Sequence, residues 1–407
     1  MTRPATLSFL CQSKMGRVLK VVKLCYSLLF TLSVTQSACA DDEDPLRIAV
    51  IGEGVIGLST ATAIKQQDPH AEITVFHDRP FEKTVSRGVA GLFRIDKPTP
   101  LQRLYGNDTF VHLAELWRTL GGFSGVQMLS GHILSEDIDM LHNQERAYAD
   151  IVYNFHFLDK RELKSQFLIK DIDRISGIHY TAFTSEGARY CPWMKKELLA
   201  NGVNFVERNI KSLDELADEG YSVVVNCAGV NGARLAGDDD DSYPIRGILL
   251  KVDAPWQKHF LMRNTTTFTI PTIGGCAVGT VKEDHQDSME ITKEEITNLW
   301  NRYLALQPSF EGVEILDHFV GLRPGRSVVR VEAETRTTSR GRTYKVVHNY
   351  GHGGSGFTLG WGTALHASSL ALDHPVDRYE QLKKAEQLLK GPTRDNYSRP
   401  ISESFHA

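Results

Sequence analysis

The 407-residue sequence contains little cysteine. Three of its six cysteines fall within the first 40 residues, and the other three, Cys191, Cys227 and Cys276, are far apart in the chain. A disulfide framework or a structural zinc site needs cysteines in pairs or at close spacing. The sequence therefore predicts neither of these, and we expect no bound metal.

Acidic residues are absent from residues 1–40, which contain five basic residues. An apolar run at 24–34 and the small residues Ala38-Cys39-Ala40 complete this segment. A basic flank, a short apolar core and an A-x-A site are typical of a secretory signal peptide. A membrane anchor is the alternative, but the run is shorter than the about 20 apolar residues that span a bilayer. We expect cleavage after Ala40, secretion and no stable membrane association, whether translation begins at Met1 or at Met15.

Positive charge is scarce in the predicted mature chain. The formal net charge of −4 becomes −9 when the five basic residues of the signal segment are removed. An acidic protein repels a phosphate backbone, so we expect no nucleic-acid partner. Secretion also agrees with three N-glycosylation acceptor sequences, which begin at Asn107, Asn264 and Asn396.

Repeats and low-complexity segments are lacking, apart from four consecutive acids at Asp238–Asp241. Like charges repel one another, so the sequence predicts a solvated loop at this position, with a cation site as the alternative. Residues 391–407 are polar and poor in apolar side chains, which predicts a disordered tail.

Apolar strand patterns alternate with helical patterns along much of the chain, which predicts an α/β fold. Pro192 is expected in the first turn of a helix that ends near Ala200, and Ser212 begins a pattern typical of a helix N-terminus. The intervening sequence is more irregular and richer in β patterns. We therefore predict a discontinuous, Rossmann-like nucleotide-binding domain with an inserted, β-rich substrate domain. The first is expected to comprise 46–95, 186–235 and 316–372, with strands at 47–51, 71–76, 203–208 and 221–226, and the second to comprise 96–185 and 236–315.

The segment "RIAVIGEGVIGLSTATAIKQQ", which starts at Arg47, combines a strand, three glycines and a helix. Gly52 and Gly54 permit a tight turn and a close approach to phosphate, and Gly57 lets the helix pack on the strand. The helix N-terminus then offers free N–H groups to a pyrophosphate. Asp78, 21 residues after Gly57, is placed to bind the adenosine ribose. The motif predicts a bound dinucleotide and leaves NAD and FAD as alternatives.

A second glycine-rich junction, "VVHNYGHGGSGFTLGWGTA", occupies 346–364. It begins as a strand and continues into glycines whose bare backbone suits a large flat ring. This stretch resembles the signature of the D-amino acid oxidase family. The resemblance extends over about residues 47–367 and implies that the dinucleotide is FAD. Shorter segments that also resemble the family lie at 84–92, 225–230, 251–260 and 321–324.

The resemblance implies a flavin oxidase. In such an enzyme the α-hydride of a D-amino acid passes to flavin N5, and dioxygen reoxidises the flavin and yields hydrogen peroxide. The imino acid then hydrolyses to a 2-oxo acid and ammonia. FAD carries this chemistry while the protein binds and orients the substrate, so no catalytic side chain is expected.

The resemblance also implies where the cofactor lies. The pyrophosphate is expected at the first glycine turn, the adenosine near the end of the second strand, and the flavin ring along two of the family segments. The expected cofactor-binding residues are Gly52, Gly54, Val55, Ile56, Gly57, Asp78, Arg79, Thr84, Val85, Ala90, Gly91, Leu92, Ile210, Ala228, Gly353, Gly354, Ser355, Gly356, Phe357 and Thr358.

Arg323, in "GLRPGR", is the residue that the resemblance implies for the substrate α-carboxylate. A guanidinium fork suits this role because it binds a carboxylate through two hydrogen bonds. The family contains oxidases of neutral D-amino acids and of D-aspartate, and a second carboxylate needs a second cation in a dry pocket. Lys282, Arg263 and Arg94 are candidates for that cation. Together they favour acidic substrates, D-aspartate and D-glutamate.

Phe268 departs from the family pattern, which places a tyrosine at this position to help hold the carboxylate. A hydrogen bond to a charge contributes about 1.5–3 kcal/mol, so its loss predicts a weaker enzyme. Gly354 or Ser355 is expected to accept the substrate amine through a backbone carbonyl. For His348 and His352 we expect structural roles, with catalysis as the alternative.

Three alternatives accompany the prediction of an oxidase for acidic D-amino acids. They are an oxidase of neutral D-amino acids, a catalytically weak or silent flavin-binding homologue, and an NAD-dependent dehydrogenase. Comparing turnover of D-aspartate and D-alanine distinguishes the first alternative from the predicted oxidase of acidic D-amino acids. Peroxide release with any D-amino acid excludes the second, and a yellow preparation excludes the third.

Overall fold

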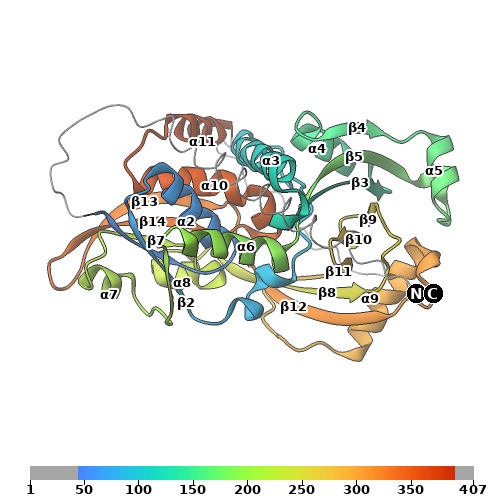
Figure 1. Cartoon of the computed structure of the whole chain (residues 1–407). Helices are drawn as coiled ribbons and strands as arrows, with labels where there is room; N and C mark the ends of the chain where they lie inside the picture. The colour runs from blue at the N-terminus through green and yellow to red at the C-terminus, as the bar shows by residue number, and fades with distance from the viewer. Residues whose placement is uncertain (1–44, 390–407) are drawn as a thin grey trace, which may run out of the picture. The chain divides into compact units, whose positions relative to one another are not determined.

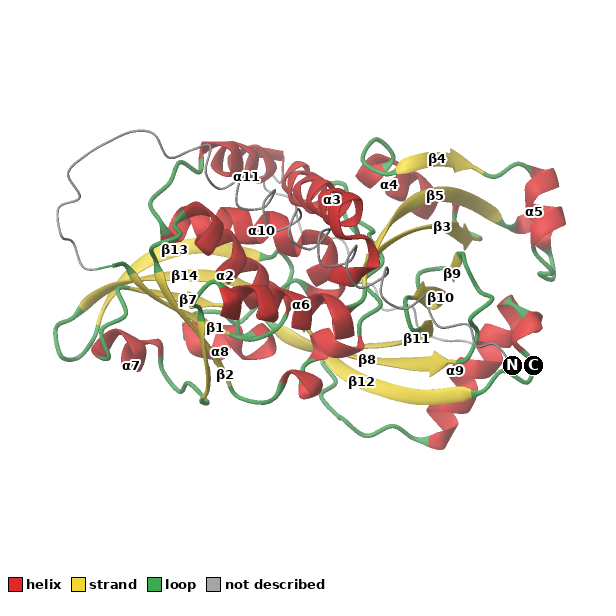
Figure 2. Ribbon diagram, viewed as in Figure 1, coloured by secondary structure: helices red, strands yellow, loops and turns green. Residues whose placement is uncertain are grey.

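The computed structural model describes residues 45–389. The predicted signal peptide at 1–40, the predicted tail at 391–407 and Asn396 lie outside the described residues. The described strands form one sheet of six strands and one sheet of eight strands, drawn in yellow in Figure 2.

The six-stranded sheet consists of β1 (Arg47–Ile51), β2 (Glu72–His77), β6 (Asn204–Glu207), β7 (Val223–Asn226), β13 (Arg330–Thr337) and β14 (Thr343–Tyr350). Its order is β13-β14-β7-β1-β2-β6. All neighbours are parallel except β13, which pairs antiparallel with β14 at one edge. The central strands β1 and β7 are buried along nearly their whole length, as expected for a parallel sheet that is covered on both faces.

Helices cover both faces of this sheet: α2 (Val55–Gln67), α6 (Gly187–Ala200) and α10 (Gly356–Ala371) on one side, and α7 (Leu213–Asp218) and α8 (Gly232–Ala236) on the other. On β1, Ile48 and Val50 belong to the core that includes α2 and α10. Ala49 and Ile51 belong to the core that includes α7 and α8. Successive residues of a strand point to opposite faces, so this alternation fixes the three layers, and Figure 1 shows α2 and α10 on the opposite side from α7.

The eight-stranded sheet consists of β3 (Val126–Ser135), β4 (Tyr153–Phe157), β5 (Ser176–Ser185), β8 (Tyr243–Val252), β9 (Phe260–Arg263), β10 (Thr267–Thr272), β11 (Gly275–Asp284) and β12 (Ile315–Gly325). Its order is β12-β8-β11-β10-β9-β3-β5-β4, and only the β3–β9 pair is parallel. Two short helices, α4 (Ile138–Tyr148) and α5 (Lys160–Gln166), follow β3 and β4. A longer helix, α9 (Lys293–Leu306), packs Leu299 and Tyr303 in one core with Ile248 and Val278. It thereby covers one face of β8 and β11.

Two further helices, α3 (Pro100–Leu120) and α11 (Asp377–Leu389), complete the described structure. The Thr99 side chain accepts a hydrogen bond from the Gln102 N–H, and Pro100 is the first residue of the helix. Threonine at the N-cap and proline at the first position are common at helix N-termini. α3 packs against α10. The helix corrects the expectation that residues 96–185 are irregular and β-rich throughout.

The structure differs from the sequence-based prediction at two other elements. α6 begins at Gly187, so Pro192 lies inside the helix rather than in its first turn. Burial of Tyr190 and Cys191 in the core favours this earlier start, although proline supplies no N–H to the helix. β12 pairs with β8 and so belongs to the eight-stranded sheet, although the sequence groups 316–325 with the nucleotide-binding segments. Ser212 caps α7 as predicted, because its side chain accepts the Asp214 N–H.

Candidate active site

A cavity of about 650 Å³ is lined by residues of both sheets. Gly52 and Asp78 line it at the carboxyl ends of β1 and β2, where open α/β sheets bind nucleotides. Arg323 and Lys282 line it from β12 and β11. The cavity brings together the predicted cofactor and substrate residues, except for three that do not line it: Gly57, Ser355 and Arg263.

The turn between β1 and α2 has the close contacts that its glycines predict. Gly52 has a φ of +116°, and a Cβ there would lie 2.4 Å from the carbonyl oxygen of Cys227. A Cβ at Gly57 would lie 1.9 Å from the carbonyl oxygen of Gly52. Gly54 is the N-cap of α2, so the first-turn N–H groups of the helix follow it directly. The Val55 N–H donates to the Ser86 hydroxyl at 3.1 Å, and the later N–H groups of this turn are the ones left for a phosphate.

Asp78 and Arg79 form a bidentate ion pair directly after β2. The Arg79 Nε and Nη2 atoms donate to the two carboxylate oxygens of Asp78 at 2.8 and 2.6 Å. Hydrogen bonding from Arg79 holds the pKa of Asp78 below its usual range, so the carboxylate is charged at neutral pH. A charged acceptor at this end of the cavity is suited to ribose hydroxyls.

The second glycine-rich junction forms a turn at Gly353–Ser355 that leads into α10. Gly353 has a φ of +54°, and a Cβ at Gly354 would lie 4.0 Å from Cδ of Arg323. The turn thus lies beside the predicted carboxylate ligand. Ser355 is buried, and its hydroxyl donates at 2.7 Å to Asp96, which lines the cavity.

Arg323 and Lys282 lie on one face of three neighbouring strands. β8 lies between β12 and β11, and Gly247 of β8 is directly opposite Gly321 on one side and Lys282 on the other. Directly opposite residues share a face, and so do residues two apart in a strand, so Arg323 and Lys282 both point toward the cavity. α9 covers the opposite face of the sheet.

Gly247 leaves the space that the Arg323 guanidinium occupies. A Cβ at Gly247 would lie 1.9 Å from Nη1 of Arg323. The guanidinium donates to the Thr280 hydroxyl at 3.2 Å and to the Arg246 carbonyl oxygen at 3.5 Å. Within the described residues neither Arg323 nor Lys282 forms an ion pair, and burial lowers the pKa of Arg323 despite the charges of nearby carboxylates. These two cations are therefore available to an anionic ligand.

Arg94 lines the cavity but already has an anionic partner. Its guanidinium pairs with Asp96 and donates to the Gln144 side chain at 3.2 Å. Burial alone would raise the pKa of Asp96, but Arg94, the Ser355 hydroxyl and the charge of Lys282 lower it, so Asp96 stays ionised. Arg94 thus already has an ionic partner, and its role in binding a substrate carboxylate stays a prediction.

Arg263 is the predicted substrate cation that the structure places outside the cavity. It ends β9 and pairs with Glu136, with Nε 3.1 Å from the carboxylate. The preceding residue, Met262, lines the cavity and lies opposite Phe268 on β10. Because neighbouring residues of a strand point to opposite faces, Arg263 points away from the site.

Phe268 lines the cavity where the family pattern has a tyrosine. It is half-buried and lies opposite Gly279, where a Cβ would be 2.4 Å from its ring. The ring fills space between the strands and has no hydroxyl to donate to a carboxylate. The apolar lining here, with Met262 and Leu249, helps to keep water out of the substrate end.

The two histidines near the second glycine junction are held by neighbouring polar groups. His352 contacts the Thr363 hydroxyl at 3.0 Å, and burial lowers its pKa to about 3. His348 contacts Glu334 at 2.9 Å and the Asn226 side chain at 3.3 Å, and burial also lowers its pKa. Both rings are buried and neutral at physiological pH, which supports the structural roles expected for them.

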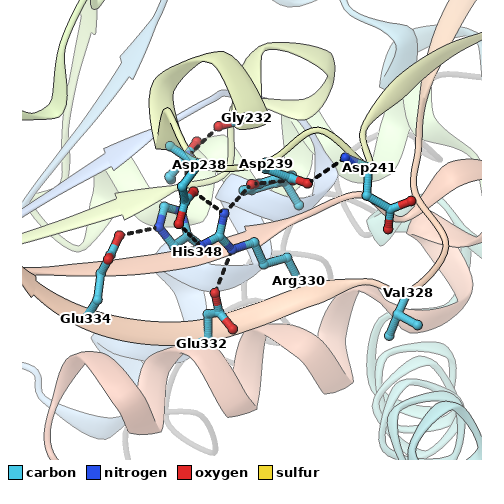
Figure 3. Close-up of polar contacts among 12 residues, drawn as sticks. Gly232, Asp238, Asp239, Asp241, Val328, Arg330, Glu332, Glu334 and His348 are labelled. Carbon is cyan, nitrogen blue, oxygen red and sulfur yellow. Dashed lines mark hydrogen bonds and ion pairs between the residues drawn. The ribbon is translucent and has the colours of Figure 1, made fainter. Parts of the chain in front are cut away.

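Two acids of the run after α8 are paired with arginines (Figure 3). Arg330 donates to both carboxylate oxygens of Asp238, at 2.6 and 2.9 Å. Asp239 accepts from Arg326 at 3.0 Å and from the Tyr350 hydroxyl at 2.7 Å. The prediction of a solvated loop is wrong for the Asp239 side chain, which is 2% exposed, whereas the Asp238 side chain is 52% exposed, as predicted. Arg326 and Arg330 lie more than eighty residues further along the chain, so the sequence run alone did not reveal its partners.

Comparison with known proteins decides the family. The family model described as FAD dependent oxidoreductase matches residues 47–370. The chain belongs to this family. It is 49% identical over 326 residues to D-aspartate oxidase 2 of Caenorhabditis elegans, which covers 80% of this chain and 96% of that protein. It is 32% identical over 333 residues to D-aspartate oxidase of Homo sapiens, which covers 80% and 95%.

Solved structures with the same fold include glycine oxidase from Geobacillus kaustophilus and L-proline dehydrogenase from P. horikoshii. Their TM-scores are 0.67 and 0.66, at sequence identities of 18% and 14%. The first comparison covers 81% of this chain and 96% of that structure, and the second covers 84% and 99%. The fold is thus that of this FAD dependent oxidoreductase family, an α/β nucleotide-binding sheet joined to a second sheet.

The cavity of this FAD dependent oxidoreductase fits the cofactor of its family. Glycines whose Cβ atoms would collide with neighbouring backbone form the turn for the pyrophosphate, and Asp78 lies where the adenosine ribose is expected. The segments that the resemblance assigns to the flavin line the same cavity as Arg323. Bare backbone at Gly353 and Gly354 suits the flat ring. Each part of the dinucleotide thus has matching residues in one continuous cavity.

Two residues of the site were not predicted from the sequence. Asp96 lies two residues beyond Arg94, and an acid so close to a candidate cation was a signal that the cation could be neutralised. Gly247 lies in an ordinary strand pattern, and only the structure shows that its missing side chain makes room for Arg323.

Proposed function

We propose that this protein is an FAD-dependent oxidase of acidic D-amino acids, D-aspartate and D-glutamate, which forms a 2-oxo acid, ammonia and hydrogen peroxide from substrate, dioxygen and water. The observation that carries the proposal is that Arg323 and Lys282, on one face of the sheet in the cavity, have no ionic partners among residues 45–389. Two cations match two carboxylates. The names of the relatives, D-aspartate oxidases in nematodes and in Homo sapiens, support the same substrate class.

The two cations have different tasks in this proposal. Arg323 binds the α-carboxylate through its guanidinium fork, which fixes both the position and the orientation of the substrate. Lys282 binds the side-chain carboxylate as a point charge. Arg94 and Asp96 neutralise each other, so Arg323 and Lys282 are the cations that β11 and β12 offer to the ligand.

The remaining residues orient the reacting carbon. FAD, when bound, accepts the hydride and passes the electrons to dioxygen. The Gly354 carbonyl accepts a hydrogen bond from the substrate amine beside Arg323. Phe268 and Leu249 exclude water from this end of the cavity, which strengthens the charge contacts. Orientation matters because a misplacement of about 1 Å can cost roughly a hundredfold in rate.

A peroxide assay on the purified protein tests this function. We expect peroxide release with D-aspartate and D-glutamate, weak release with D-alanine and none with L-aspartate. A preference for D-alanine would replace the proposal by a neutral D-amino acid oxidase. A yellow protein that releases no peroxide with any of them would show a silent flavin-binding homologue.

We further propose that the protein is exported and glycosylated. The basic and apolar pattern of residues 1–40 supports export. None of the described helices is long and apolar enough to cross a membrane. Asn107 is exposed on α3, and Asn264 is exposed in the turn between β9 and β10.

Expression of the full chain in a eukaryotic secretory host should give a protein in the medium that begins at Asp41 and loses mass on treatment with an N-glycosidase. Retention inside the cells with residues 1–40 intact would contradict export.

A further inference from the structure

The phosphate-binding turn contains a buried acid. Glu53 lies between Gly52 and Gly54 and lines the cavity. Its side chain is 1% exposed. A carboxylate at this position places a negative charge next to the site of the pyrophosphate, which is itself negatively charged. The charge of Glu53 must therefore be neutralised for the turn to attract the cofactor.

Lys195 of α6 is the residue that neutralises Glu53. Its ammonium group donates to Oε1 of Glu53 at 2.6 Å. Lys195 does not line the cavity and stays partly exposed, with 34% of its side chain accessible. It acts on the cavity only through Glu53.

His77 does not replace Lys195 as a hydrogen-bond donor. Its Nε2 lies 3.3 Å from Oε2 of Glu53, but that oxygen has no hydrogen-bond partner. The Nδ1 atom of His77 contacts the carbonyl oxygen of Arg79 at 3.0 Å, and a carbonyl can only accept, so Nδ1 carries the hydrogen. Lys195 is thus the one side chain in the described structure that donates a hydrogen bond to Glu53.

We propose that Lys195 is a positioning residue for FAD: it neutralises Glu53 beneath the glycine turn, so that the pyrophosphate meets backbone donors without an opposing charge. Removing one partner of a buried ion pair leaves an uncompensated charge, whereas removing both does not. The effect of Lys195 on the cofactor therefore depends on Glu53. A purely structural role in packing α6 would not depend on it.

A double-mutant cycle on FAD affinity tests this proposal. Apoprotein of the full chain is titrated with FAD, and binding is followed by flavin fluorescence, with circular dichroism as a check of folding. We expect Lys195→Met to weaken FAD binding by about tenfold or more, which is 1.4 kcal/mol. Lys195→Arg, which keeps the charge and the donor, should stay within about threefold of the unmodified protein.

The variants that remove the acid show whether Lys195 affects FAD affinity through Glu53. Glu53→Gln should bind FAD at least as tightly as the unmodified protein, and Glu53→Gln combined with Lys195→Met should recover to within about threefold of it. If Lys195→Met does not fold, the FAD affinities of these two variants still show whether the charge of Glu53 opposes FAD binding. A double variant that binds as weakly as Lys195→Met, or about tenfold weaker binding in Glu53→Gln alone, would overturn the proposal.

Discussion

At the scale of single residues, the missing side chain of Gly247 allows Arg323 to lie flat across β8. The guanidinium then reaches the Thr280 hydroxyl and lies on the same face as Lys282. Any larger residue at position 247 would occupy the place of the guanidinium, because even a Cβ would be 1.9 Å from Nη1. The position of the carboxylate ligand is thus set by a neighbouring strand as well as by its own backbone.

Gly247→Ala tests this arrangement. We expect kcat/KM to fall about a hundredfold for D-aspartate and D-alanine alike, because a displaced guanidinium misplaces every substrate. The measurement is steady-state peroxide formation together with the flavin content, which should be unchanged. Unaltered kinetics would show that Arg323 does not need this space.

Lys282→Met tests the second cation. We expect kcat/KM for D-aspartate to fall about 30-fold, since a hydrogen bond between charged groups contributes about 2 kcal/mol. Lys282 is exposed where it lines the cavity, so its replacement leaves no buried gap. The value for D-alanine should change little, because this substrate has no side-chain carboxylate. Arg263→Met is the matched control, a cation on the same sheet that points away from the cavity. Equal losses for both substrates in Lys282→Met would contradict the assigned role.

At this scale the sequence reveals residue types but not all of their partners. The reason given for Gly57 agrees with a local contact, because a Cβ there would meet the carbonyl oxygen of Gly52. The close contact of Gly52 is with Cys227, which lies far away in the sequence. Asp96 lies two residues from Arg94, so the sequence offered a signal for this pair. Arg263 had no such signal, because Glu136 becomes its partner only when the chain folds and the face of β9 depends on pairing with β10.

At the scale of elements, three histidines form a row across β3, β5 and β4. His132 is opposite His179, which is opposite His156, and Nε2 of His132 lies 3.1 Å from Nδ1 of His179. Burial and then the neighbouring histidines lower the pKa of His132 to about 4, and the pKa of His179 is lowered as well. Folding therefore favours the neutral rings of His132 and His179.

The row predicts a loss of stability in acid. A histidine whose pKa is lowered by folding takes up its proton more readily in the unfolded chain, so stability is complete above pH about 6.5 and falls toward pH 4. We expect the Tm to decrease between pH 7 and pH 5, and His132→Gln to reduce this decrease by a few degrees. His70→Gln, at an exposed turn, is the control. An unchanged pH dependence in His132→Gln would exclude the row as its source.

Elements with a simple pattern were predicted well from the sequence. β1, β2 and β7 are short apolar runs, as buried parallel strands should be, and they lie within a residue or two of the predicted ranges. The assignment of β12 to a sheet was missed because strand partners are set by contacts distant in sequence. α3 was missed although Thr99 and Pro100 mark its start, because the surrounding segment was interpreted as irregular.

At the scale of the whole molecule, the acidic chain encloses a cationic substrate end. The net charge of −9 for residues 41–407 describes the average surface, whereas a buried ligand responds to the few groups that line its cavity. Arg323 and Lys282 therefore outweigh distant carboxylates, which water and salt screen. A protein with a net negative charge can therefore bind a negatively charged substrate, because local cations line the cavity.

The cofactor should also contribute to the stability of the whole fold, since its cavity is lined by both sheets. A ligand that binds only the folded state adds about 4 kcal/mol when its concentration is 1,000 times Kd. We expect removal of FAD to lower the Tm by several degrees, and added FAD, but not NAD, to restore it. A Tm that does not respond to FAD would contradict the assignment of the cavity.

The central claim is that two cations on one sheet face hold a substrate with two carboxylates. It is tested most directly by the binding of non-reacting analogues to the FAD-loaded protein, followed by the change in flavin absorbance. Succinate and propionate are the matched pair, because they are D-aspartate and D-alanine without the amine. The arrangement predicts that succinate binds about 30-fold tighter than propionate. Equal dissociation constants for the two acids would contradict it.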